Sequence, residues 1–74
     1  MELVEVEDEL RLLDNITYNF GAKVEKGKVN EIQYYILDTG EKCADIWVEC
    51  EDGTYTCIGT EEIISIIKEK KNDK

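Results

Sequence analysis

The chain contains no histidine, and this absence narrows the chemistry that it can carry out. Histidine is the commonest general base near neutral pH, the usual partner of a serine or cysteine nucleophile, and the commonest metal ligand. Without it, most familiar hydrolase designs are excluded. Cys43, Cys50 and Cys57 recur every seven residues, a spacing that matches no zinc-site pattern. We therefore expect no enzymatic activity, no catalytic residues, no cofactor and no bound metal.

Basic residues are scarce: 9 lysines and arginines stand against 18 acidic residues, giving a net charge of −9. A field of this sign repels nucleic acid phosphates and anionic membrane surfaces alike. We expect no direct contact with nucleic acid or membrane. The same field steers the chain towards basic protein surfaces, including those that other proteins use to hold nucleic acid.

Long apolar runs, linkers and proline are also missing. No stretch approaches the roughly 18 apolar residues of a membrane span, and the acidic start lacks the basic and apolar regions of a signal peptide. An odd number of cysteines fits a reducing compartment. The expectation is one small cytoplasmic domain over residues 1–74.

What the sequence does contain is two alternating runs that meet at Asp52-Gly53. This dipeptide between alternating apolar residues predicts a two-residue hairpin turn of type I′. Trp47 then lies opposite Ile58. The apolar face of the hairpin carries Ile46, Val48, Cys50, Tyr55 and Cys57. The opposite, mixed face carries Asp45, Trp47, Glu49, Glu51, Thr54, Thr56 and Ile58.

The preceding strand joins this hairpin through a predicted three-residue loop, which puts Ile32 opposite Val48. An odd loop length is needed because a one-residue slip would exchange the two faces. On the mixed face, this register puts Tyr35 opposite Asp45, Gln33 opposite Trp47, and Glu31 opposite Glu49.

The complete pattern predicts an α+β fold built on a small antiparallel β meander. The expected strands are 29–37, 43–51 and 54–58, extended by 16–20, with Gly27 marking a turn or bulge before the longest strand. The isoleucine stripe after Thr60 predicts a C-terminal helix over 61–70. Residues 2–13 have the spacing of an amphipathic helix, with a strand as the competing interpretation because of Val4 and Val6.

The mixed face supplies the candidate binding site, because an aromatic patch rimmed by acids suits a partner bearing arginine or lysine. A competing interpretation is that a terminal helix covers Trp47 and makes the sheet two-sided. The candidate partner-binding residues are Tyr35, Asp45, Trp47, Glu49, Glu51 and Ile58.

In spacing, the sequence between Gly27 and Ile64 resembles SH3-like small barrels of the Tudor and KOW kind. The segments that carry the resemblance are Gly27-Lys28-Val29-Asn30-Glu31-Ile32, Asp45-Ile46-Trp47-Val48-Glu49, Glu51-Asp52-Gly53-Thr54 and Glu61-Glu62-Ile63-Ile64. Tudor domains bind methylated lysine or arginine in aromatic cages, but no cage maps residue by residue here, and the predicted terminal helices depart from a plain barrel. In size and acidity the chain is similar to small phage-encoded inhibitors of host or defence proteins, some of which mimic nucleic acid.

Two functions follow as expectations. The first is a non-enzymatic module that occupies a basic surface of a partner protein, such as a nucleic-acid-binding protein, as an inhibitor. The alternative is an SH3-like or Tudor-like adaptor that reads a peptide or a modified side chain. Binding driven by charge weakens steeply with ionic strength, whereas binding in an apolar groove does not.

Overall fold

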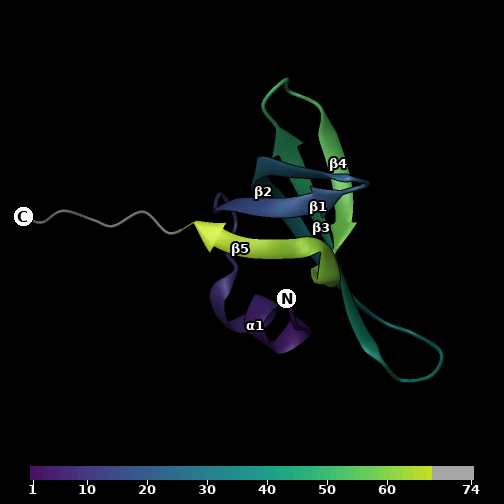
Figure 1. Ribbon diagram of the computed structural model, residues 1–74. Helices are drawn as coiled ribbons and strands as arrows, with labels where there is room; N and C mark the ends of the chain where they lie inside the picture. Colours follow the sequence, from purple (N-terminus) through teal and green to yellow (C-terminus); the bar gives the residue numbers. More distant parts are fainter. Residues whose placement is uncertain (68–74) are drawn as a thin grey trace, which may run out of the picture.

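The computed structural model describes residues 1–67, which form a five-stranded antiparallel sheet and one short α-helix (Figure 1). In chain order the elements are α1 (Leu3–Glu9), β1 (Asn15–Phe20), β2 (Lys23–Ile36), β3 (Lys42–Cys50), β4 (Tyr55–Gly59), the 3-10 helix η1 (Thr60–Glu62) and β5 (Ile63–Ile67). The strand order is β4-β3-β2-β1-β5, so β5 returns to pair with β1 after three consecutive hairpins. Within the described part, no helix is long and apolar enough to cross a membrane.

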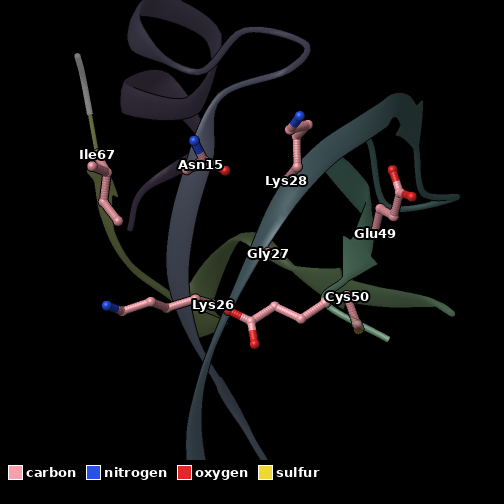
Figure 2. Close-up of a pocket in the computed structure, with 8 residues that line it drawn as sticks. Asn15, Lys26, Gly27, Lys28, Glu49, Cys50 and Ile67 are labelled. Atoms are coloured by element: carbon pink, nitrogen blue, oxygen red, sulfur yellow. The ribbon is translucent and has the colours of Figure 1, made fainter. Parts of the chain in front are cut away.

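The longest strand, β2, pairs with β1 along its first half and with β3 along its second half. Gly27 belongs to both pairs: it lies opposite Ile16 of β1 and opposite Cys50 of β3 (Figure 2). A Cβ atom at this position would lie 2.9 Å from the carbonyl oxygen of Glu49 and would also strike the Val48 side chain. The prediction of a turn or bulge at Gly27 is therefore wrong, since both pairings run through it without a shift. The glycine instead lets two backbones approach inside a continuous strand.

The turn between β3 and β4 differs from the predicted type I′ turn. The Gly53 N–H donates to the Cys50 carbonyl at 3.0 Å, and the Cys50 N–H donates to the Thr54 carbonyl at 2.7 Å. Gly53 is left-handed, with φ of 88°, whereas Asp52 is not. The loop therefore holds three residues, a type I turn closed by a glycine bulge.

This loop shifts the pairing of β4 by one residue from the predicted register. Trp47 pairs with Cys57, and Ile46 pairs with Ile58. Because side chains alternate along a strand, the slip exchanges the two faces of β4. Ile58 is buried, and Tyr55 and Cys57, which were predicted for the core, are exposed.

The hairpin between β2 and β3 uses the same kind of turn. The Leu37 N–H donates to the Glu41 carbonyl at 2.8 Å, and Gly40 has φ of 90°. The predicted loop length of three is confirmed, but the loop lies earlier, so that Ile32 pairs with Ile46 and not with Val48. The partner of Ile32 in β3 is thus two residues away from the predicted one. Because side chains alternate with a period of two, this shift alone moves no side chain to the other face of the sheet.

A bulge between Val29 and Glu31 then changes the faces within β2. On the N-terminal side of the bulge, Val29 pairs with Val48 and is fully buried. The sequence pattern had placed Val29 on the mixed face. The extra residue is Asn30, which is exposed. The bulge thus adds one apolar side chain to the core.

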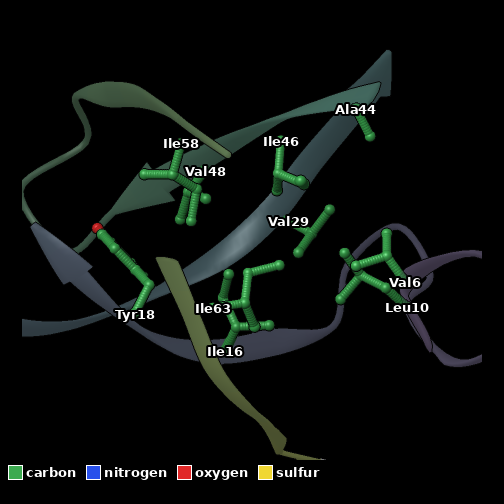
Figure 3. Packing of buried hydrophobic residues seen from close by; sticks show 10 residues of the cluster. All are labelled: Val6, Leu10, Ile16, Tyr18, Val29, Ala44, Ile46, Val48, Ile58 and Ile63. Carbon is green, nitrogen blue, oxygen red and sulfur yellow. The ribbon is translucent and has the colours of Figure 1, made fainter. Parts of the chain in front are cut away.

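The core is one cluster to which α1 and all five strands contribute (Figure 3). Its buried members are Val6, Leu10, Ile16, Tyr18, Val29, Ala44, Ile46, Val48, Ile58 and Ile63. The helix prediction for the N-terminal segment is confirmed over a shorter span than 2–13, and the strand alternative is wrong. The Arg11 guanidinium ends α1 by donating to the carbonyls of Glu7, Asp8 and Leu10.

The predicted helix over 61–70 is wrong for the residues that the structure describes, and residues 68–70 lie outside them. The chain forms η1 and then the strand β5. Four of the five residues of β5 are isoleucines, whose branched side chains fit a strand better than a helix. Ile63 packs in the core, and Ile64 and Ile67 are exposed.

Gly27→Ala is expected to destabilise the protein by about 1–3 kcal/mol, because the new methyl group overpacks a site bounded by backbone. Chemical denaturation followed by tryptophan fluorescence measures this cost. Gly59→Ala is the matched control, since the three atoms nearest to a Cβ there all belong to the flexible Glu61 side chain. Equal stabilities of the two variants would contradict the close approach at Gly27.

Candidate protein-binding face

The outward side of the β2, β3 and β4 strands forms one continuous surface, which we call the Trp47 face. Its position follows from the register, because residues paired across neighbouring strands lie on the same side of the sheet. The Trp47 face consists of Lys28, Glu31, Gln33, Tyr35, Cys43, Asp45, Trp47, Glu49, Tyr55 and Cys57.

Three aromatic side chains are exposed on this face, one from each strand. The exposed fractions are 42% for Tyr35, 38% for Trp47 and 56% for Tyr55. Trp47 and Tyr55 line a shallow hollow together with Asn30 and Glu31. The competing interpretation, in which a terminal helix covers Trp47, is wrong for residues 1–67, because α1 packs its buried residues into the core.

Three carboxylates lie among these rings. Glu31 pairs directly with Trp47, and Glu49 pairs with Tyr55. Asp45 lies two residues before Trp47 in β3, so both side chains point to the same side. The predicted opposition of Glu31 and Glu49 is wrong, since Glu49 lies opposite Lys28. The observed register thus replaces a repulsion between like charges with an attraction.

Asp45 holds the Tyr35 end of the face in place. The Tyr35 hydroxyl donates to Oδ1 of Asp45 at 3.3 Å. Partial burial, followed by the charge of Asp45, raises the pKa of Tyr35 above its ordinary value. The phenol therefore stays protonated at neutral pH and remains a hydrogen-bond donor.

Cys57, one of the two cysteines on the face, is not activated. Burial raises the pKa of the Cys57 thiol, and the nearby charges of Asp45 and Glu62 raise it further. A thiol with a raised pKa is a poor nucleophile at neutral pH. Cys50 is half-buried, with Sγ 3.5 Å from the Tyr18 hydroxyl, and all three cysteines are free.

The structure brings most of the predicted binding residues together. Tyr35, Asp45, Trp47 and Glu49 lie on the Trp47 face, and Glu51 is exposed in the turn just beyond β3. Ile58 does not belong to the face, because the one-residue slip of β4 buries it in the core. The same slip brings in Tyr55, which sequence reasoning had assigned to the core.

A second hollow, of about 400 Å³, opens beside the Trp47 face around Gly27 (Figure 2). Its charged lining consists of Lys26, Lys28, Glu49 and Glu51. Both signs of charge are present, so this hollow has no clear preference for a cation or an anion. The Trp47 face, where carboxylates outnumber lysines, has such a preference.

Comparisons with protein-family models, curated proteins and solved structures found no match for this chain. The site must therefore be understood from its own chemistry. Among residues 1–67, no group of three or more cysteine, aspartate or glutamate side chains could hold a metal ion. What the Trp47 face does present is aromatic rings next to carboxylates, the groups that attract organic cations.

Trp47→Ala is expected to cost less than about 2 kcal/mol of stability, compared with about 3–5 kcal/mol for a core aromatic. The reason is that the ring is partly solvent-exposed and lies outside the core cluster. Thermal unfolding followed by circular dichroism measures the difference, with Tyr18→Ala as the buried control. In the wild-type protein, iodide should quench the fluorescence of Trp47. A blue-shifted emission that iodide does not quench would contradict the exposure of this face.

Proposed function

We propose that the protein is a non-enzymatic binding module whose Trp47 face occupies a basic surface of a partner protein. The observation that carries this proposal is the gathering of Tyr35, Trp47 and Tyr55 with three carboxylates on one exposed side of the sheet. Exposed aromatics at the centre of a polar patch are typical of the residues that dominate protein interfaces.

The chemistry of the face selects a partner rich in arginine and lysine. Each ring attracts a cation over its surface, and a neighbouring carboxylate accepts the hydrogen bonds of the same cation. The net charge of −9 adds a long-range attraction that speeds encounter with a basic surface. Since many basic surfaces bind nucleic acid, the protein would act as an inhibitor that competes with nucleic acid for its partner.

We assign no catalytic role and place the protein in the cytoplasm. Both proposals rest on the sequence: the chain has no histidine, and its odd number of cysteines suits a reducing compartment. The raised pKa of Cys57 is consistent with a thiol that does no chemistry.

A second candidate is an SH3-like adaptor that reads a peptide or a modified side chain. It is favoured by one observation: β5 returns to β1 directly after the 3-10 helix η1, an arrangement that resembles SH3-like small barrels. An adaptor of this kind would use the hollow between Trp47 and Tyr55 as a side-chain pocket.

Binding of a fluorescent nine-residue arginine peptide, followed by anisotropy, tests the leading proposal. Trp47→Ala should weaken binding by about 2 kcal/mol or more, whereas Phe20→Ala, which removes an exposed ring elsewhere, should not. Glu31→Gln should weaken binding more than Glu41→Gln, a change of equal charge at the hairpin tip.

Ionic strength separates the two candidates. Affinity that falls steeply between low and physiological salt supports a charge-driven inhibitor, and affinity that is nearly constant supports the adaptor. Equal effects of Glu31→Gln and Glu41→Gln, together with no effect of Trp47→Ala, would exclude the Trp47 face as the binding surface.

A further inference from the structure

The strand β5 forms one edge of the sheet. It pairs with β1 on one side, and among residues 1–67 no strand pairs with its other side. At the start of this edge both main-chain groups of Ile63 are engaged: its carbonyl accepts a hydrogen bond from the Met1 ammonium at 3.3 Å, and its N–H donates to the Thr60 carbonyl. An edge of this kind presents main-chain donors and acceptors that another strand can use.

The sequence of β5 is a palindrome: Ile63-Ile64-Ser65-Ile66-Ile67 reads the same in both directions. When two identical strands pair antiparallel about Ser65, Ile63 faces Ile67 of the other copy and Ile64 faces its Ile66. Every isoleucine then meets an isoleucine. This is the self-complementarity that a two-fold symmetric interface requires.

β5 has a bulge at Ile64 in its pairing with β1, but it lacks the charged residues and proline that usually prevent strand pairing. Natural edge strands carry charges, especially lysine, or proline. β5 carries neither, and 48% of Ile64 and 41% of Ile67 are exposed. Exposed apolar side chains on an unpaired edge strand favour association with another strand.

Further exposed apolar residues lie close to the end of β5. Leu12 and Leu13 are 58% and 70% exposed, and Asn15, which follows them, pairs directly with Ile67. Leu13 is also left-handed, with φ of 74°, a conformation that leucine adopts at an energetic cost. The Leu13 N–H donates to the Val29 carbonyl at 2.8 Å, so this leucine lies on the β2 side of β1 and is not part of the β5 edge.

The distribution of charge permits two copies to meet at this edge despite the net charge of −9. The carboxylates of the Trp47 face lie on β2 and β3, and β1 separates β5 from these strands. β1 itself carries no charged residue, and the neighbouring part of β2 carries Lys23, Lys26 and Lys28 against the single acid Glu25. Repulsion between the acidic faces is therefore smallest when the contact is made through β5.

We propose that β5 is a homodimerisation strand, which pairs antiparallel with β5 of a second copy about a two-fold axis at Ser65. The pairing joins two five-stranded sheets into one of ten strands and leaves both Trp47 faces exposed. Pairing along the whole strand also requires Ile63 to give up its hydrogen bonds with the Met1 ammonium and the Thr60 carbonyl. The dimer does not depend on the proposed function, since it uses the opposite edge of the sheet.

Sedimentation equilibrium of the full chain over a range of concentrations tests the dimer. The expected result is a mass that rises to twice that of the monomer. Ile64→Lys should raise the dissociation constant at least about tenfold, because the two-fold axis places the new charge twice in the interface. Ile36→Lys is the matched control at the hairpin tip, where the side chain is 65% exposed, and should leave the constant unchanged. Circular dichroism confirms that both variants are folded.

A monomer at every concentration would overturn the proposal, as would species larger than a dimer or a dimer that Ile36→Lys disrupts and Ile64→Lys does not. Ser65→Cys tests the register, because the two introduced thiols would face each other across the axis and form a disulfide under mild oxidation. The wild-type protein, with its three free cysteines, is the control for other cross-links. A dimer in which Ser65→Cys cross-links no faster than the wild type would show that the proposed pairing is wrong.

Discussion

The close approach of two backbones at Gly27 is the constraint on which the rest of this structure depends. β2 can serve both β1 and β3 because no side chain separates Gly27 from the Glu49 carbonyl. This contact brings the two halves of the sheet around one core, into which α1 and β5 each add buried residues. In a domain of this size the core is small, so adding one methyl group at the crossing would cost a large share of the available stability.

Turn geometry then decides which side chains face the solvent. Gly53 and Gly40 each close a three-residue loop, and the loop at Gly53 sets the register of β4. With one residue fewer, Ile58 would be exposed beside Trp47, and Tyr55 would be buried. The main-chain hydrogen bonds of Cys50 close this loop, and so they determine which residues of β4 belong to the candidate binding face.

Local pattern was sufficient to predict the three hairpin strands, the N-terminal helix and the sides on which Ile32, Ile46 and Trp47 lie. It could not predict the register of β4, because Asp52-Gly53 suits both a two-residue and a three-residue turn. Charge carried a signal against the predicted register of β2 and β3: the predicted pairing opposed Glu31 to Glu49, and the observed pairing sets Glu49 against Lys28. For the segment of β5, the helical spacing of the isoleucines led to the prediction of a helix, although isoleucine prefers strands. In the structure, pairing with β1 makes this segment a strand.

The register of β4 is the point on which the composition of the Trp47 face rests, and nuclear magnetic resonance measures it directly. In an antiparallel pair, short distances between backbone protons connect residues that lie opposite each other. We predict nuclear Overhauser effects linking the backbones of Trp47 and Cys57 and those of Glu49 and Tyr55. Effects that link Trp47 with Ile58 and Glu51 with Thr54 would contradict this account, because they would place Ile58 on the exposed face and Tyr55 in the core.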